Sequence, residues 1–460
     1  MKFFSNQFNK GLHGMFFRAL PGCALLVVLF GCSKPPAENL LFISFDTTRA
    51  DHLSAYGYKI KTSPNIDALA AQGVLFQRAF SHAPSTLPSH ASMFTGKLPP
   101  DHGVRCNGKF TLPEEQLTLA EILYGNGFET GAVLGAFPLD KRFGLDQGFS
   151  FYDDDFRLSQ LTLKHQASER VMDKVGFWQG QTYLDFERNA YEVTTLATKW
   201  LQKTKGRWFL FVHYFDPHEP YEPPPAWRTL FENQYDAEIA FADRQLGKLL
   251  ETVNSMPGKT LIVFTADHGQ GLGDHGEITH DRYLYDSTQW IPLVFCMKDK
   301  IKAGSKIINP VSHIDVMPTI LDLLGVPSTE GIQGRSLAKA ILAGEDLENK
   351  PIYMESLSHK LEKPEGIDVR GLVRDNWKFI LTNEEHGGKK TIRKELYDLD
   401  SGGGGGGENA DLSLKEAGRA AEMDKKLSGW VEKLEHEGAK PNPLKISEET
   451  RQKLKSLGYL

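Results

Sequence analysis

Three short apolar segments of the chain each lead directly into residues that can bind a metal ion or transfer a proton. Short apolar runs of this kind are typical of strands that are buried on both faces of a parallel sheet. Ligands bind beyond the carboxyl ends of such strands, so we expect the polar residues to converge in one crevice. The segments and their polar residues are 40–45 with Asp46, 209–215 with Asp216 and His218, and 261–266 with Asp267 and His268.

Segment 84–96, with the sequence PSTLPSHASMFTG, predicts a hydroxyl group at the start of a helix. We expect Thr86 to be the N-cap residue and Pro88 to fall in the first turn, where a missing N–H removes no intrahelical bond. A hydroxyl at this point faces free backbone N–H groups and the positive end of the helix dipole, which suit a nucleophile and a developing oxyanion. On this segment alone, a simple capped helix is an equally good interpretation.

The same segment resembles the signature of the sulfatase family, which belongs to the alkaline phosphatase superfamily. Aligned on Pro88 and Gly96, the nucleophile position of that signature falls on Thr86. Sulfatases use a formylglycine made from cysteine or serine, and threonine cannot give that aldehyde. The arginine that supports the formylglycine is replaced here by His90. The resemblance therefore indicates superfamily relatives that attack phosphorus with a threonine, such as nucleotide phosphodiesterases and phosphoethanolamine transferases.

The residues that follow two of the apolar segments resemble the metal ligands of the same family. The resemblance implies that Asp46, Asp267 and His268, together with the oxygen of Thr86, form one four-ligand site for a divalent metal ion. Carboxylate and imidazole ligands favour zinc or manganese, with calcium as an alternative. A second aspartate, frequent in the family, is replaced here by Thr47.

Four histidines complete the predicted site. The segment HYFDPHEPY at 213–221 is similar to the ester-binding segment of sulfatases, and the resemblance implies that His90, His213, His218 and His280 contact the substrate. Imidazoles can bind the non-bridging oxygens of an ester, and His218 or His280 would protonate the leaving group. His213 lies inside an apolar run, so a satisfied core histidine is an equally good interpretation of that residue.

The sequence thus predicts a metal-dependent hydrolase that cleaves phosphate or phosphonate esters through a Thr86 nucleophile. The substrate would be a small molecule, or an ester group on a glycan or lipid. Three alternatives stay open: a sulfuric ester hydrolase, a transferase that delivers the phospho group to an alcohol, and an inactive binding lipoprotein. The lysine-containing segment of many sulfatases is absent, and participation of Lys141 or Asp216 is also left open.

The predicted fold is of the α/β class and like that of alkaline phosphatase and the sulfatases. It has a mixed, mostly parallel sheet between helices and a small C-terminal antiparallel subdomain. Helical patterns at 117–124 and 316–324 alternate with the strand-like segments, and a further helical pattern covers 412–435. The predicted parts are a lipoprotein signal peptide (1–31), a tether (32–38), the catalytic domain (39–345), the small subdomain (346–401), a poly-glycine hinge (402–407) and a helical tail (408–460).

The N-terminal residues have the composition of an export signal. Residues 1–31 contain three basic and no acidic residues, and their apolar run 19–30 is too short to span a bilayer. The sequence LFGC that ends at Cys32 resembles a bacterial lipobox. We therefore predict that Cys32 is lipidated and that the protein is an exported lipoprotein, anchored to a membrane of the cell envelope at the periplasmic side or the cell surface. A plain secretory signal is the alternative.

The remaining composition limits the classes of partner. Removal of residues 1–31 changes the formal net charge from −6 to −9, which disfavours nucleic acid as a partner. Only Cys106 and Cys296 remain after Cys32. One disulfide is conceivable between them, but the spacing matches neither a disulfide framework nor a zinc–thiolate site.

Overall fold

The computed structural model describes residues 38–156, 187–362, 366–400, 407–440, 442–444 and 447–448 of the chain. The chain divides into two units, Met1–Lys34 and Pro35–Leu460, and every element below belongs to the second. The predicted signal peptide, the lipidation site Cys32 and residues 402–406 of the predicted hinge lie outside the described residues.

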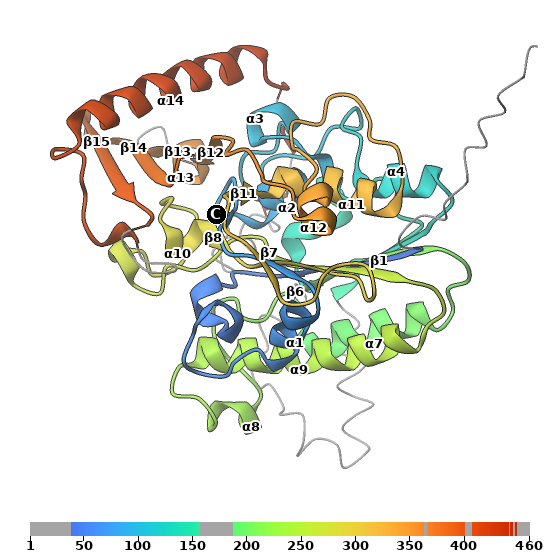
Figure 1. The fold of residues 1–460 in the computed structure, drawn as a ribbon. Helices are drawn as coiled ribbons and strands as arrows, with labels where there is room; N and C mark the ends of the chain where they lie inside the picture. The colour runs from blue at the N-terminus through green and yellow to red at the C-terminus, as the bar shows by residue number, and fades with distance from the viewer. Residues whose placement is uncertain are drawn as a thin grey trace, which may run out of the picture. The chain divides into compact units, whose positions relative to one another are not determined.

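A mixed eight-stranded sheet with the order β10-β2-β9-β7-β1-β6-β4-β5 lies at the centre of this unit (Figure 1). Strand β1 runs parallel to both of its neighbours, with Ile43 paired to Val212 of β6 and to Phe264 of β7. Strand β9 is antiparallel to β7 and to β2. The strands are β1 (Asn39–Phe45), β2 (Val74–Phe76), β4 (Glu129–Val133), β5 (Phe151–Asp153), β6 (Trp208–Tyr214), β7 (Thr260–Ala266), β9 (Leu293–Cys296) and β10 (Ser305–Ile307).

Helices cover both faces of this sheet because successive residues of β1 enter two different hydrophobic cores. Leu40 and Phe42 lie in the core shared with α2, α4, α11 and α12, whereas Leu41 and Ile43 lie in the core shared with α1, α7 and α9 (Figure 1). Burial of each such side chain stabilises the fold by about 1.5–3 kcal/mol. The helices are α1 (Pro64–Gln72), α2 (Thr86–Thr95), α3 (Pro99–His102), α4 (Leu119–Gly125), α7 (Ala190–Leu201), α8 (Pro225–Arg228), α9 (Gln234–Ser255), α10 (Asp286–Gln289), α11 (Val316–Leu324) and α12 (Ala338–Ala343).

A four-stranded antiparallel sheet follows in the C-terminal part, as predicted. Its strands are β12 (Ile352–Ser356), β13 (Ile367–Arg374), β14 (Trp377–His386) and β15 (Lys389–Asp398), and α13 (Ser358–Glu362) lies between the first two in sequence. Helix α14 (Ala417–Glu437) packs on this sheet, with Met423 and Leu427 in one core with Leu372 and Phe379. A small third sheet has the order β11 (Val311–Ser312), β3 (Ala79–Phe80) and β8 (Trp290–Ile291).

Local hydrogen bonds explain two differences between predicted and observed helix starts. Helix α4 begins at Leu119 because Thr118 and Glu121 form a capping box ahead of it. Helix α14 begins at Ala417, five residues later than predicted, because Asp411 accepts hydrogen bonds from the backbone N–H and the hydroxyl of Ser413. Such an Asx turn competes with helical hydrogen bonding.

Among the described residues, Cys106 and Cys296 are both buried and form no disulfide. Over the ranges that the structure describes, no helix combines the length and the apolar character needed to cross a membrane.

Candidate active site

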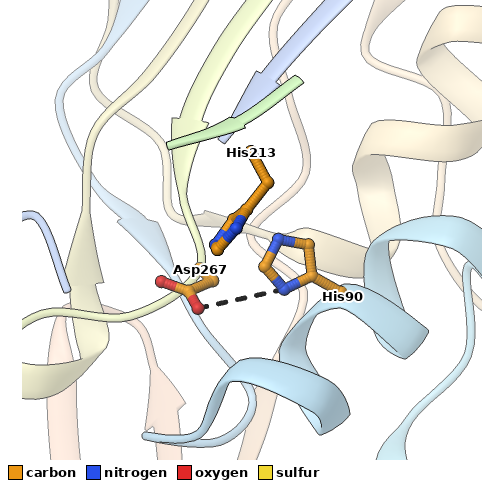
Figure 2. A group of neighbouring side chains, drawn as sticks. All are labelled: His90, His213 and Asp267. Carbon is orange, nitrogen blue, oxygen red and sulfur yellow. Dashed lines mark ion pairs between the residues drawn. The ribbon is translucent and has the colours of Figure 1, made fainter. Parts of the chain in front are cut away.

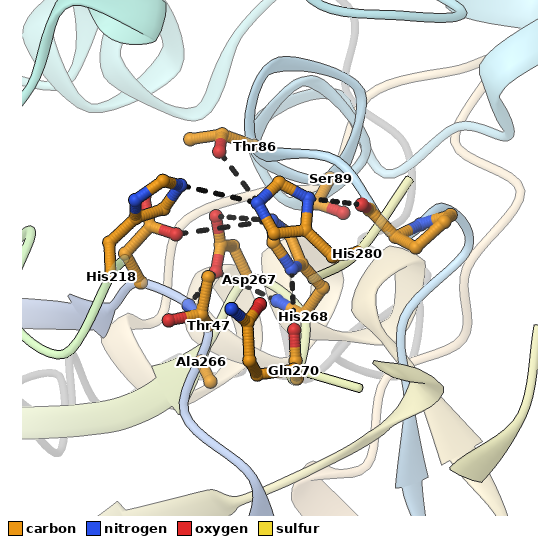
Figure 3. A network of polar contacts seen from close by, with 12 residues as sticks. Thr47, Thr86, Ser89, His218, Ala266, Asp267, His268, Gln270 and His280 are labelled. Carbon is orange, nitrogen blue, oxygen red and sulfur yellow. Dashed lines mark hydrogen bonds and ion pairs between the residues drawn. The ribbon is translucent and has the colours of Figure 1, made fainter. Parts of the chain in front are cut away.

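The predicted acidic residues lie at adjacent strand ends of the central sheet. Asp46 follows β1 and Asp267 follows β7, and both side chains are completely buried. The first turn of α2 brings Thr86 toward the same point, as Figure 3 shows. Parallel pairing of β1 with β7 places the two carboxylates side by side, so the structure brings these two predicted site residues together.

The two carboxylates have buried oxygen atoms without hydrogen bonds. Asp267 Oδ1 accepts from the backbone N–H of Thr47 (3.1 Å) and of His268 (2.8 Å), but Asp267 Oδ2 and both oxygens of Asp46 make no well-aligned hydrogen bond to a described residue. Burial raises the pKa of Asp46 to about 7, against the opposing effect of His280. Burial and the neighbouring Asp46 also raise the pKa of Asp267 well above its usual range. Buried carboxylates of this kind fit a cation.

His268 directs the lone pair of Nε2 toward the carboxylates of Asp46 and Asp267. Its Nδ1–H donates to the backbone carbonyl of Gly269 (2.9 Å), which leaves Nε2 unprotonated in the neutral ring. Burial lowers the pKa of His268 well below the usual value, so the ring is neutral. Nε2 lies 3.5 Å from Asp267 Oδ2 and 3.5 Å from Thr86 Oγ1. A backbone acceptor that fixes the tautomer in this way is typical of a metal-binding histidine.

Helix α2 begins one residue earlier than we predicted. Ser85 has the extended backbone of an N-cap (φ −151°, ψ 136°) and Thr86 is the first helical residue. The Thr86 hydroxyl therefore does not cap the helix and is directed toward His268 instead. The second N–H of the helix, that of Leu87, donates to Asn107 Oδ1 (2.8 Å).

Asn107 is a residue of the site that the sequence did not indicate. Its side chain is buried, and its Nδ2 has no hydrogen-bond partner among the described residues. It thus holds an amide donor close to the N-terminus of α2. No motif or strand end marks Asn107, because its place depends on a contact with Leu87 across twenty residues of sequence.

The donor set fits one divalent ion. Ligand atoms of Asp46, Asp267 and His268 all lie within 4.8 Å of one another, and all three residues are buried. Thr47, at the place of the family's second aspartate, has φ +48°, and its hydroxyl donates to the carbonyl of Pro217 (3.0 Å). Thr47 is therefore not a ligand in this arrangement.

His218 and His280 form a pair beside the carboxylates (Figure 3). His218 Nδ1–H donates to the carbonyl of Glu219 (2.6 Å), so its Nε2 accepts the proton of His280 Nε2 at 3.2 Å. His280 Nδ1 also donates, to the carbonyl of Pro84 (3.2 Å), so His280 carries both ring protons. Burial opposes this charge, but Asp281 outweighs it and raises the pKa of His280 to about 9, whereas burial and His280 lower that of His218 to about 3.

His90 and His213 lie next to Asp267 (Figure 2). His90 donates from Nδ1 to the carbonyl of Thr86 (2.7 Å), and its Nε2 contacts the hydroxyl of Ser44 (3.0 Å). Both nitrogens of His90 are thus engaged within the protein, and the geometry supports a positioning role for the first turn of α2 and not a contact with substrate. His213 Nε2 lies 3.2 Å from Asp46 Oδ2, and burial lowers the pKa of His213 to about 3.

The two residues left open by the sequence lie in different surroundings. The Lys141 side chain is 67% exposed and pairs with Asp154 (3.6 Å), so it does not replace a lysine in the buried site. Asp216 is buried, and burial raises its pKa to about 7.

Solved structures with a similar arrangement of strands and helices define the fold class of this protein. A putative sulfatase from Bacteroides thetaiotaomicron has a TM-score of 0.70 and 20% identity, and the match covers 91% of this chain and 96% of that one. The phosphonate monoester hydrolase of Agrobacterium radiobacter has a TM-score of 0.68 and 21% identity, with 87% and 96% covered. The predicted fold, of the alkaline phosphatase and sulfatase type, is confirmed.

The sequence comparisons identify the family within this class. A family profile described as Sulfatase matches residues 38–326, and one described as N-sulphoglucosamine sulphohydrolase, C-terminal, matches residues 273–407. The chain belongs to the sulfatase family. It is 23% identical over 424 residues to the uncharacterized sulfatase YidJ of Escherichia coli (strain K12), which covers 78% of this chain and 82% of that protein. It is 24% identical over 479 residues to an N-acetylglucosamine-6-O-sulfatase of Bacteroides thetaiotaomicron, with 81% and 83% covered.

Proposed function

We propose that this chain hydrolyses phosphate or phosphonate esters, with Thr86 as the nucleophile. The observation that carries the proposal is the Thr86 hydroxyl itself. It is buried at the first turn of α2, 3.5 Å from His268 Nε2, and beside carboxylate oxygens that have no hydrogen bonds. Asp46, Asp267 and His268 would hold one divalent ion together with the Thr86 oxygen, with zinc or manganese favoured over calcium.

The reaction has two steps, and the chain supplies groups for both. When bound, the ion stabilises the alkoxide form of Thr86 and polarises the ester. The Thr86 hydroxyl releases its proton to solvent, and Oγ1 forms a bond to phosphorus while the bond from phosphorus to the leaving oxygen breaks. His280, which carries protons on both nitrogens, gives one to the leaving oxygen. Water then gives one proton to His280 and attacks phosphorus, the bond from phosphorus to Thr86 Oγ1 breaks, and Thr86 takes up one proton from solvent.

The backbone N–H groups that follow Thr86 in the first turn of α2 are already engaged: Pro88 has none, and that of Ser89 donates to the carbonyl of Ser85 (3.2 Å). The N–H of Leu87 donates to Asn107, whose own Nδ2 has no hydrogen-bond partner among the described residues. This amide and the doubly protonated His280 are two donors of the site. Such donors suit an oxyanion.

A sulfuric ester is the second candidate substrate, because the chain belongs to the sulfatase family. Threonine argues for phosphorus, since it cannot become the aldehyde that the family's sulfate chemistry uses. A phospho-group transferase would share every residue named above and differ only in its acceptor. An inactive binding protein is disfavoured, because a site without chemistry has no need to retain Thr86 beside three metal-binding groups.

The ester group would be carried by a small molecule, a glycan or a lipid. Structural neighbours include a phosphonate monoester hydrolase from Silicibacter pomeroyi and a protein in complex with its substrate D-glucosamine-2-N,6-O-disulfate. We further propose that Cys32 is lipidated and anchors the protein to a membrane of the cell envelope. The sequence LFGC after a basic and then apolar segment supports that placement.

Rates on matched aryl esters test the proposed substrate class. The chelated protein is loaded with zinc, manganese or calcium, and each form is assayed with 4-nitrophenyl phosphate, a 4-nitrophenyl phosphonate, a phosphate diester and 4-nitrophenyl sulfate. We expect a phosphorus ester to be the best substrate with zinc or manganese. A preference for the sulfate with every metal would contradict the proposal.

A further inference from the structure

His213 has an environment that hydrogen bonding within the protein does not explain. The side chain is completely buried in β6, and neither Nδ1 nor Nε2 makes a well-aligned hydrogen bond to a described residue. Leaving a buried polar group without a partner costs about 1–3 kcal/mol. Native proteins retain such groups where an ion, a water molecule or a ligand is the partner.

Its distance from Asp46 matches that of two ligands on one ion. His213 Nε2 lies 3.2 Å from Asp46 Oδ2. Two adjacent donor atoms that each lie about 2.0–2.1 Å from a four- or five-coordinate zinc ion are separated by about 2.8–3.6 Å. The pair His268 Nε2 and Asp267 Oδ2, at 3.5 Å, shows a similar separation. His213 also lies in a group with His90 and Asp267 whose ligand atoms are all within 4.8 Å (Figure 2), and Asp267 is the residue that this group shares with the group of Asp46 and His268.

The other histidine of that group is not available as a ligand. His90 Nδ1 must carry a proton because the atom it contacts, the carbonyl oxygen of Thr86, only accepts. Its Nε2 is engaged by the hydroxyl of Ser44. Ser44 of β1 is paired with His213 of the neighbouring strand β6. Because both nitrogens of His90 are engaged, His213 is the histidine of this group that can offer a lone pair to the metal ion.

Compared with the family pattern, the predicted set of metal ligands lacks one carboxylate. Thr47 stands where the family has a second aspartate, and its hydroxyl is turned to the carbonyl of Pro217. The ligands Asp46, Asp267 and His268, with Thr86, do not replace that carboxylate. A neutral imidazole on the adjacent strand can supply it.

We infer that His213 Nε2 is a direct ligand of the same divalent ion that Asp46, Asp267 and His268 hold. The inference rests on the metal site in the proposed function. It makes the protein ligands of this ion two carboxylates, two imidazoles and the nucleophile oxygen. It also separates His213 from the substrate-binding role that the sequence suggested for it.

Counting imidazole ligands tests the inference without an activity assay. The full chain is loaded with one equivalent of zinc, and the X-ray absorption fine structure at the zinc edge is recorded for the wild type and for His213→Asn. We expect two imidazoles in the wild type and one in the variant. One imidazole in the wild type, or two in both proteins, would overturn the inference and leave the proposed metal site intact. Failure of the wild type to bind zinc at all would overturn both.

Zinc affinity by competition with a chromophoric chelator gives a second readout. Loss of a group that only orients a ligand weakens binding by about 10–100-fold. We expect His213→Ala to weaken it by more than about 100-fold. His102→Asn is the matched control, because His102 is equally buried but engages Ser92 and the N–H of Val104. An affinity in His213→Ala equal to that in the control would count against the inference. If His213→Ala does not fold, His213→Gln is used in its place.

Discussion

Replacing Asp46 by asparagine should have opposite effects on the metal-free and the metal-loaded protein. Burial raises the pKa of Asp46 from 3.8 to about 7 in the protein without an ion. The unfolded chain therefore releases this proton near pH 4, whereas the native protein holds it to about pH 7. Native Asp46 binds more protons than unfolded Asp46 in that window, so the metal-free protein loses stability as pH rises through it.

The size of the effect follows from the shift. About three pKa units correspond to about 4 kcal/mol at pH 8, where Asp46 is charged in both states. Asparagine has nearly the same shape and no charge to bury. We expect Asp46→Asn to raise the free energy of unfolding of the metal-free protein at pH 8 by up to about 4 kcal/mol. With saturating zinc the order should reverse, because the wild type gains the binding free energy of the ion.

Urea unfolding at pH 8, with chelator and then with zinc, measures both effects. Glu355→Gln is the control: Glu355 is as buried as Asp46, but Arg105 and Arg370 lower its pKa against the effect of burial. This control should be destabilised with and without metal. If Asp46→Asn lowers the free energy of unfolding in chelator, as we expect for Glu355→Gln, then the buried Asp46 carboxylate does not destabilise the metal-free protein, and the reasoning is refuted.

Other substitutions test separate parts of the account. Asp267→Asn and His268→Ala should each lose bound metal, measured by elemental analysis, and nearly all activity while circular dichroism stays unchanged; equal metal content in variant and parent would contradict their assignment. His280→Gln should slow hydrolysis of alkyl esters by about 100-fold or more and that of 4-nitrophenyl esters much less, because a good leaving group needs no proton; equal losses would rule out His280 as the acid. In the wild type, alkyl ester hydrolysis should fall as pH rises through the pKa of His280, and Asp281→Asn should move that fall to lower pH. Cys32→Ala should release the protein from the membrane fraction, and unchanged fractionation would contradict lipidation.

The parts of the fold that follow from local pattern were predicted well. Apolar runs bounded by polar residues gave β1 and β7 within a residue, and the helical pattern at Val316–Leu324 matches α11 at both ends. Each of these segments is buried on both faces or on one stripe, so its periodicity is visible in the residues alone. The ends of β1 and β7 then place Asp46 and Asp267 without further information.

The details of the site depend on contacts between segments that are far apart in sequence. Thr86 proved to be the first helical residue, because Ser85 and not Thr86 has the extended backbone of the N-cap. The contact of His90 with Ser44 joins two elements forty-six residues apart. The position of Asn107, whose Nδ2 has no hydrogen-bond partner among the described residues, likewise depends on a contact with Leu87, twenty residues away in sequence. Residue type and spacing predict which groups reach a crevice, but they do not predict which atoms find partners there.

The central claim is that Thr86 attacks phosphorus, and a covalent intermediate tests it most directly. The metal-loaded protein is acid-quenched during turnover of a phosphate ester and digested, and the peptide that contains Thr86 is analysed by mass spectrometry. We expect this peptide to gain the mass of one phosphoryl group, located on Thr86, and we expect Thr86→Ala to show neither the modification nor turnover. Thr86→Ser should keep a measurable fraction of both, because it retains a hydroxyl. An unmodified peptide from the wild type, together with an active Thr86→Ala variant that prefers aryl sulfates, would contradict the account.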